Sequence, residues 1–144
     1  MTHLPASAGA GFKAEHASDI LGGKASVGWF EIHPENYMVA GGPRLAMLAD
    51  VCAQYPVSMH GVGLSLGGGD PLDTRHLADL KRLVDRFNPA MVSEHIAWSS
   101  HEGLYMADLL PTPMTKTSLD QLVAAIDTVQ SHIGRRILIE NPTS

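Results

Sequence analysis

The sequence is short of the residues that build disulfide frameworks, membrane spans and secretion signals. It contains a single cysteine, Cys52, so no disulfide can form within the chain. Cys52 falls on the apolar face of a predicted helix, where we expect a buried structural thiol. No apolar run approaches the roughly 20 residues that a membrane-spanning helix requires. Residues 1–16 lack a basic segment followed by an apolar one, so we expect a cytoplasmic protein without a membrane partner.

Positive charge is also scarce. The 10 Lys and Arg residues are outnumbered by 15 Asp and Glu residues, which gives a net charge of −5 with neutral histidines. A nucleic-acid-binding protein normally carries a basic stripe, so we expect no nucleic-acid partner. Apolar residues make up 44% of the 144 residues, enough for one globular domain with a sizeable core. Without an internal repeat or a linker, residues 1–144 are expected to form a single domain.

Strand-like and helix-like spacings of apolar residues alternate along the chain. Short runs rich in β-branched and aromatic residues predict strands, and apolar residues three and four apart predict helices between them. We expect strands at 8–13, 26–33, 56–63, 90–98 and 135–142, helices at 14–21, 41–55, 73–87 and 116–134, and a long loop between the fourth strand and the last helix. Thr117 and Asp120 have capping-box spacing in that helix, Gly134 is a good stop, and the expected apolar stripe is Leu119, Leu122, Val123, Ile126 and Val129.

This rhythm predicts an α/β fold with a parallel sheet, because the strands read as continuous apolar runs buried on both faces. Two architectures fit it: an open doubly wound sheet, or part of a (β/α) TIM-type barrel. A complete eight-stranded barrel usually needs about 250 residues. The chain supplies about five of the eight strands and stops directly after a strand, whereas an open sheet more often ends on a covering helix. We therefore expect the N-terminal segment of a TIM-type barrel, truncated after the fifth strand.

Polar residues stand where the predicted strands end, which is where parallel β/α folds gather their active sites. Histidine nitrogens and carboxylate oxygens at several strand ends suit iron, manganese or zinc, although a hydrogen-bonded structural role is an alternative for any single histidine. Neighbouring residues of a strand face opposite sides, so we expect His95 to face the barrel interior and Glu94 to pair or cap in the next layer. The polar residues at these ends are Glu35, Asn36, His60, Glu94, His95, Glu140 and Asn141.

The stretch "GVGLSLGGGDP" suggests a phosphate-binding loop at first sight. It lacks the G-K-[ST] of a P-loop, and it follows the third strand rather than the first, as a dinucleotide-binding fingerprint would. We interpret it as a flexible turn over the mouth of the barrel.

Several blocks of the sequence, in order, resemble one family. "WFEIHPENYM", "MHGVGLSLGG", "SEHIAWS", "DLLPTPMT" and "ILIENPTS" are similar to the DUF692 (UPF0276) proteins. These are multinuclear non-heme iron-dependent oxidases related to the methanobactin biosynthesis enzyme. The resemblance runs from about Gly9 to Ser144.

The resemblance implies a TIM-type barrel that carries two or three iron ions at its mouth and uses dioxygen to modify cysteine residues of ribosomally made peptides. It further implies a cysteine-containing precursor peptide as substrate and a small partner protein that binds the peptide's leader. His60, His95 and Glu140 match positions of iron ligands, and Glu35, Asn36, Glu94 and Asn141 fall in matching blocks as additional ligands or their supports. Family members are longer, and about half of their metal ligands lie in strands that this chain does not contain.

Two other interpretations stay open. A xylose-isomerase-like barrel, acting as a metal-dependent isomerase or endonuclease, uses the same ligand types on the same fold. A non-catalytic fragment that binds a partner through its open sheet is the other. An unclosed sheet exposes the edges of its first and last strands, near Gly11 and Ile139, and exposed edges pair with other chains. We therefore also expect a homo-oligomer.

Overall fold

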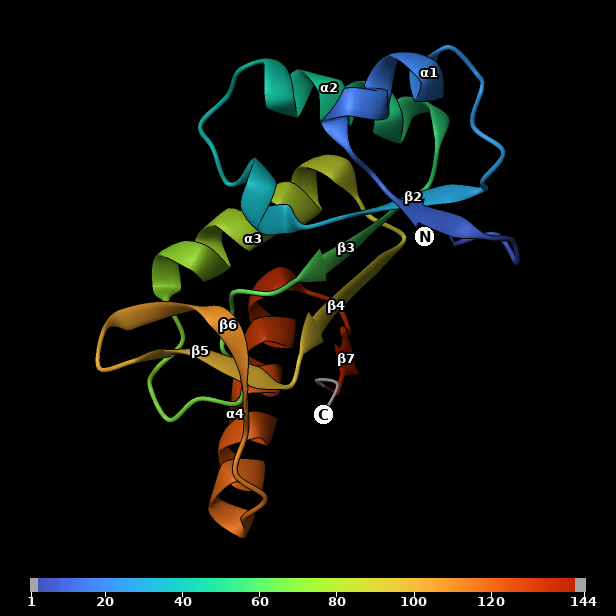
Figure 1. Cartoon of the computed structure of the whole chain (residues 1–144). Helices are drawn as coiled ribbons and strands as arrows, with labels where there is room; N and C mark the ends of the chain where they lie inside the picture. The colour runs from blue at the N-terminus through green and yellow to red at the C-terminus, as the bar shows by residue number, and fades with distance from the viewer. Residues whose placement is uncertain (1–2, 142–144) are drawn as a thin grey trace.

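The computed structural model describes residues 3–141, and its centre is a parallel sheet of five strands (Figure 1). The order in the sheet is β1-β2-β3-β4-β7, the same as the order in the chain, and each neighbouring pair is parallel. A doubly wound sheet reverses its strand order at a switch point, whereas this sheet advances in one direction. The strands are β1 (Gly9–Gly11), β2 (Trp29–Ile32), β3 (Val57–Gly61), β4 (Met91–His95) and β7 (Leu138–Glu140).

Helices connect the strands, and the alternation confirms the prediction of a mixed α/β fold that forms part of a TIM-type barrel. No helix within residues 3–141 combines the length and apolar character that crossing a membrane requires. The connections contain the 3-10 helices η1 (Ala14–His16) and η2 (Pro34–Tyr37), and the α-helices α1 (Ala17–Leu21), α2 (Pro43–Gln54), α3 (Thr74–Phe87) and α4 (Lys116–Ile133).

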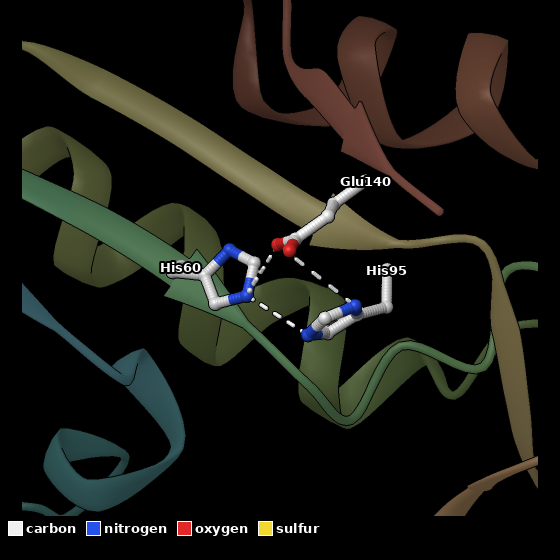
Figure 2. Close-up of side chains that lie close together, drawn as sticks. All are labelled: His60, His95 and Glu140. Carbon is white, nitrogen blue, oxygen red and sulfur yellow. Dashed lines mark hydrogen bonds and ion pairs between the residues drawn. The ribbon is translucent and has the colours of Figure 1, made fainter. Parts of the chain in front are cut away.

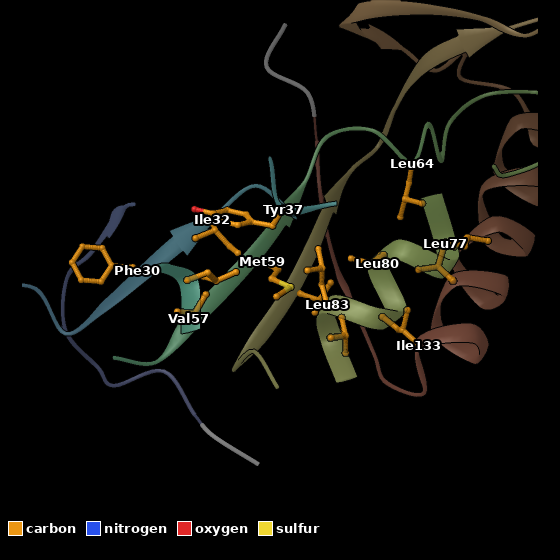
Figure 3. Close-up of a cluster of buried hydrophobic side chains, with 14 of the residues drawn as sticks. Phe30, Ile32, Tyr37, Val57, Met59, Leu64, Leu77, Leu80, Leu83 and Ile133 are labelled. Atoms are coloured by element: carbon orange, nitrogen blue, oxygen red, sulfur yellow. The ribbon is translucent and has the colours of Figure 1, made fainter. Parts of the chain in front are cut away.

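The hydrophobic core lies between one face of the sheet and the helices (Figure 3). Alternate residues of a strand share a face. On the face toward the helices, the side chains of β2 and β3, and of β4 as far as Val92, are apolar. Leu45 and Leu48 from α2, Leu83 from α3 and Val129 from α4 cover them and are themselves almost fully buried. The strand residues of this core are Phe30, Ile32, Val57, Met59 and Val92.

The ends of α4 show where local sequence signals were sufficient and where they were not. Gly134 ends the helix in the left-handed conformation, as predicted, with φ of 72°. The predicted capping box at Thr117 and Asp120 is wrong. Thr115 is the N-cap, and its hydroxyl oxygen accepts a hydrogen bond from the backbone N–H of Ser118 at 3.1 Å.

The predicted apolar stripe of α4 is too wide. Leu122 and Val129 are buried, but Leu119 and Val123 are 56% and 51% exposed. Helix α4 packs against α3 near the last strand of the described sheet, so only a narrow part of its surface meets the core. A pattern of apolar residues indicates which side chains can be buried, but the neighbours available decide which are.

The predicted loop between the fourth strand and α4 is wrong, because this segment forms an antiparallel hairpin. Its strands are β5 (Ala97–His101) and β6 (Leu104–Pro111), joined at Glu102 and Gly103, both of which have positive φ. The indole N–H of Trp98 donates to the carbonyl of Pro111 at 3.0 Å and ties the open end together. A register shift between Trp98 and Ser100 interrupts the alternation that would have revealed the strands.

The glycine-rich loop after β3 is bound to this hairpin rather than free. The hydroxyl oxygen of Ser65 accepts hydrogen bonds from the backbone N–H groups of Ser99 and Ser100, at 2.9 and 3.3 Å. The N–H of Gly67 donates to the carbonyl of Ala97 at 2.8 Å. The loop and the hairpin thus form one continuous wall beside the ends of β3 and β4.

Candidate metal centre

Three adjacent strands place His60, His95 and Glu140 at the same edge of the sheet. His95 in β4 is paired with Glu140 in β7, and His60 in β3 is paired with Ser93, two residues before His95. Since paired residues of a parallel sheet share a face, and so do residues two apart, all three side chains project from the face that the helices do not cover. The alternation along β4 then directs Glu94 to the opposite face.

The three side chains point toward one another (Figure 2). The Nε2 atoms of His60 and His95 lie 2.9 Å apart, and His60 Nε2 lies 3.2 Å from Glu140 Oε2. His95 Nδ1 is 4.0 Å from the same carboxylate oxygen. One ligand atom from each residue can be chosen so that all lie within 4.8 Å of one another. Side chains at this spacing could hold one metal ion between them.

The orientation of His60 is fixed by two contacts. Its Nδ1 lies 2.7 Å from the hydroxyl oxygen of Ser93, and both residues are buried. Its backbone carbonyl lies 2.9 Å from Nδ1 of His33 on the neighbouring strand's end. With Nδ1 engaged by the hydroxyl, Nε2 is the nitrogen that faces Glu140 and His95. A partner on the remote ring nitrogen is the usual way in which proteins orient a metal-binding imidazole.

In the described part of the chain, the imidazole of His95 lacks the hydroxyl partner that orients His60. Its Nδ1 is buried and has no hydrogen-bond partner within residues 3–141. Burial lowers the pKa of the imidazole, and the nearby His60 lowers it further, while Glu140 acts in the opposite direction. The environment therefore favours the neutral imidazole, which is the form that binds metal ions.

The arrangement fits a transition-metal ion on two grounds. Two ligands that each lie about 2.1 Å from an octahedral ion are about 3.0 Å apart when they are adjacent, and the observed separations from His60 Nε2 are 2.9 and 3.2 Å. Two histidines and one carboxylate with open positions form the ligand set typical of non-heme iron. Among the described residues, the side chain of Glu140 is 55% exposed.

Glu94 lies on the helix-covered face and is 3% exposed. Burial raises the pKa of this carboxyl group to about 8, and repulsion from Glu35 adds to the shift, while backbone N–H groups of His95 and Leu64 oppose it. Glu94 therefore carries a proton over much of the neutral range. It does not join the cluster of His60, His95 and Glu140.

Glu35 also lies outside this cluster. Its Oε1 accepts hydrogen bonds from the backbone N–H groups of Val62 and Gly63, at 2.8 and 2.9 Å. The same oxygen is 3.7 Å from Nε2 of His76. Its other oxygen, Oε2, is buried and has no hydrogen-bond partner within the described residues.

The two asparagines singled out from the sequence are exposed. Asn36 lines a separate cavity of about 650 Å³, which it shares with Lys13 and Arg44, and its carbonyl accepts a hydrogen bond from Arg44 at 2.9 Å. Asn141 directly follows β7 at the last described position. Neither belongs to the cluster of potential ligands in residues 3–141.

Sequence reasoning missed Ser93 and His76. Ser93 stands two residues before His95, a spacing that places it on the ligand face, but only the register with β3 shows that it meets His60. His76 belongs to α3, where helical spacing gave no functional signal.

A cavity of about 730 Å³ opens between the glycine-rich loop and the tip of the hairpin. Among its lining residues in the described part of the chain, four are acidic and none is Lys or Arg. The acidic residues are Glu35, Asp70, Asp73 and Glu102. A cationic or neutral group suits this cavity better than an anionic one.

Comparison with known proteins shows which family the chain resembles. The model of the family described as "RiPP precursor modification enzyme MbnB/TglH/ChrH" matches residues 7–144, where RiPP denotes ribosomally made and modified peptides. A UPF0276 protein of Caulobacter vibrioides is 54% identical over 137 residues, covering 95% of this chain and 49% of that protein. UPF0276 proteins of Bordetella pertussis and Rhizobium meliloti are each 50% identical, over 98% and 95% of this chain and 49% and 45% of their own lengths. The chain spans about half the length of these relatives.

Proposed function

Because the chain belongs to the MbnB/TglH/ChrH family of RiPP precursor modification enzymes, we propose that His60, His95 and Glu140 bind iron in an enzyme that uses dioxygen to modify cysteine residues of ribosomally made peptides. The observation that carries the proposal is the convergence of two imidazoles and one carboxylate from three strands. This ligand set is typical of iron sites that activate dioxygen. Bound iron would supply dioxygen binding and one-electron chemistry, which the side chains of this site do not provide.

The chain's own residues have distinct tasks in this proposal. His60 and His95 bind as neutral imidazoles, and Ser93 holds His60 with Nε2 toward the site. Glu140 contributes a carboxylate oxygen 3.2 Å from His60 Nε2. Cys52 is not a candidate nucleophile, because burial raises the pKa of its thiol to about 11.

Substrate and partners follow from the family as part of the proposal. A cysteine-containing precursor peptide is the substrate, and the acidic cavity beside the hairpin is suited to a neutral or basic segment of it. A small partner protein presents the leader of the peptide, in the cytoplasm where such precursors are made. Two or three iron ions occupy the complete enzyme, whose additional ligands come from the part of the relatives that this chain does not match.

Assembly is a further part of the proposal. Leu138 and Ile139 in β7 are 56% and 45% exposed, and β7 has a paired neighbour on one side only within the described sheet. Exposed strand edges and apolar residues promote pairing with another chain. We expect the 15.4 kDa chain to form dimers or larger oligomers through residues 136–141. A monomer mass by light scattering across micromolar concentrations would contradict this.

Elemental analysis tests the metal assignment. Protein purified without chelator is expected to contain iron, and the double variant His60→Ala/His95→Ala is expected to lose it. Iron content that does not change in the double variant would overturn the assignment.

A second experiment tests the chemistry. The full-length protein, ferrous iron, air and a cysteine-containing precursor are expected to give a mass change that needs dioxygen. Turnover with zinc alone under nitrogen would instead favour the isomerase or endonuclease interpretation, which the same ligand types allow.

A further inference from the structure

We propose that Glu35 and Glu94 act as positioning residues that clamp the turn after β3, residues 61–64, and thereby hold His60 in place for metal binding. The inference rests on the proposed function, because it assigns a role toward the same metal site. Neither carboxyl group belongs to the cluster of the three ligand side chains, although Glu94 accepts a hydrogen bond from the backbone N–H of His95 at 3.1 Å. Each instead lies against the backbone of the turn that begins directly after His60, Glu35 at Val62 and Gly63 and Glu94 at Gly61.

Glu35 holds the turn from the side of β2. It lies in η2, directly after that strand, and its Oε1 accepts hydrogen bonds from two successive backbone N–H groups, those of Val62 and Gly63. Hydrogen bonds from backbone N–H groups to a carboxylate are stronger than those between neutral partners. They also satisfy backbone donors that could not continue the ladder once β3 has ended.

Glu94 holds the same turn from the side of β4. It is paired in register with Gly61, is buried beneath the turn and packs against Gly61, and its Oε1 accepts a hydrogen bond from the backbone N–H of His95 at 3.1 Å. The two acids therefore reach successive parts of the turn from opposite neighbouring strands. Their contacts lie at the same end of the strands as His60 and His95, which project from the opposite face of the sheet.

The glycines of the turn support the clamp independently. A Cβ atom on Gly61 would collide with Oε2 of Glu94. A Cβ atom on Gly63 would lie 2.8 Å from Cε1 of His76 and 3.2 Å from Oε1 of Glu35. Neither glycine has positive φ, so neither is required for backbone conformation. Close packing of the turn onto Glu94 explains Gly61, and close packing onto His76 and Glu35 explains Gly63.

The clamp can be tested with variants that separate geometry from charge. Glu35→Asp keeps the charge but shortens the side chain, so it cannot reach both N–H groups in the same way. Glu35→Gln removes the charge but keeps an acceptor oxygen at the same distance. The matched control is Asp70→Asn, which removes an acidic group that lines the same cavity.

Each variant of this chain would be titrated anaerobically with cobalt(II), and its visible absorption and amide hydrogen exchange would be measured. Glu35→Asp is expected to weaken cobalt binding about tenfold or more, as loss of outer contacts to metal ligands commonly does. It is also expected to alter the absorption spectrum and to speed exchange at Val62 and Gly63. The cobalt affinities of Glu35→Gln and Asp70→Asn are expected to stay within about twofold of that of the unaltered chain. The Glu35→Gln variant would retain an acceptor oxygen for the turn, and residue 70 is not part of the proposed clamp.

A second route avoids dependence on one variant. Gly61→Ala alone is expected to weaken cobalt binding, and adding Glu94→Ala is expected to restore part of the loss because the collision is removed. Faster exchange at the turn with unchanged cobalt affinity and spectrum would overturn the positioning role. A loss in Glu35→Gln with none in Glu35→Asp would also overturn it, since charge rather than reach would then be the cause. No cobalt binding by the unaltered chain would instead overturn the metal assignment, and the positioning role with it.

Discussion

The two faces of the central sheet use the same strands for opposite purposes. On the helix-covered face, Val57 and Met59 of β3 lie in the hydrophobic core with their neighbours. On the other face, Ser58 and His60 alternate with them and continue into Ser93 and His95 of β4. One face therefore contributes stability through apolar burial, and the other presents polar groups to a site. Glu94 is the exception, because it is a carboxyl group on the apolar face.

The largest effect is expected from the helix-covered face. Met59 is fully buried, so Met59→Ala should lower the free energy of unfolding by about 2–5 kcal/mol through lost apolar contact and a cavity. Urea denaturation followed by circular dichroism measures this. A loss below about 1 kcal/mol would mean that the core collapses around the smaller side chain and that this face is less critical than the comparison implies.

Metal binding should stabilise the folded chain through the sheet face that carries His60, His95 and Glu140. An ion that binds only the folded state at 100 times its dissociation constant adds about 2.7 kcal/mol to the free energy of unfolding. Thermal unfolding with and without cobalt(II) would measure this gain. His95→Ala should abolish most of the gain, whereas Glu15→Gln, an exposed acidic residue far along the chain, should retain it.

A smaller, pH-dependent effect is expected from Glu94 in the metal-free chain. Its folded-state pKa is raised from 4.5 to about 8, so the folded state retains a proton that the unfolded state releases. The contribution of this group to stability is then complete below pH 4.5 and declines as the pH rises toward and through 8. Glu94→Gln should make unfolding less sensitive to pH between 5 and 8, a change of about 1 kcal/mol or more. Parallel curves for the two proteins in urea denaturation would contradict the raised pKa.

The smallest effect is expected at Ser58, the neighbour of Met59 on the other face. The hydroxyl of Ser58 is fully buried and has no hydrogen-bond partner within residues 3–141. Removing a buried hydroxyl without a partner costs little, so Ser58→Ala should change the free energy of unfolding by less than about 1 kcal/mol, toward greater stability. A clear loss in urea denaturation would show that the hydroxyl has a partner in solution.

The sequence was informative wherever a signal is local and periodic. Strand and helix order follow from apolar spacing, and Gly134 ends α4 because glycine adopts the left-handed conformation easily. Sequence signals were weaker where a residue's role depends on which backbone group it meets in the fold. Thr117 has the spacing of a cap, but Thr115 is the residue whose backbone leaves the helix, and only the structure distinguishes them.

The register between neighbouring strands is the main feature that could not be predicted from the pattern of residues. The strand-end rule selects His60, His95 and Glu140 as candidates, but it selects Asn36 and Asn141 equally. The pairing of His60 with Ser93 and of Gly61 with Glu94 decides which side chains meet. The hairpin of β5 and β6 was missed for a related reason, since its irregular register hides the alternation on which strand prediction depends.

Strands that pair in chain order allow the sheet to grow while the polypeptide is being synthesised. Each new strand finds its partner already present, so the early part of the sheet can form before the later part has left the ribosome. The proposed metal ligands enter in the same sequence: His60, then His95, and finally Glu140 with the last strand of the described sheet. These three residues therefore come together only after β7 has docked. Because metal affinity depends on the folded arrangement of all ligands, retention of the ion would report that the growing chain has paired its strands correctly.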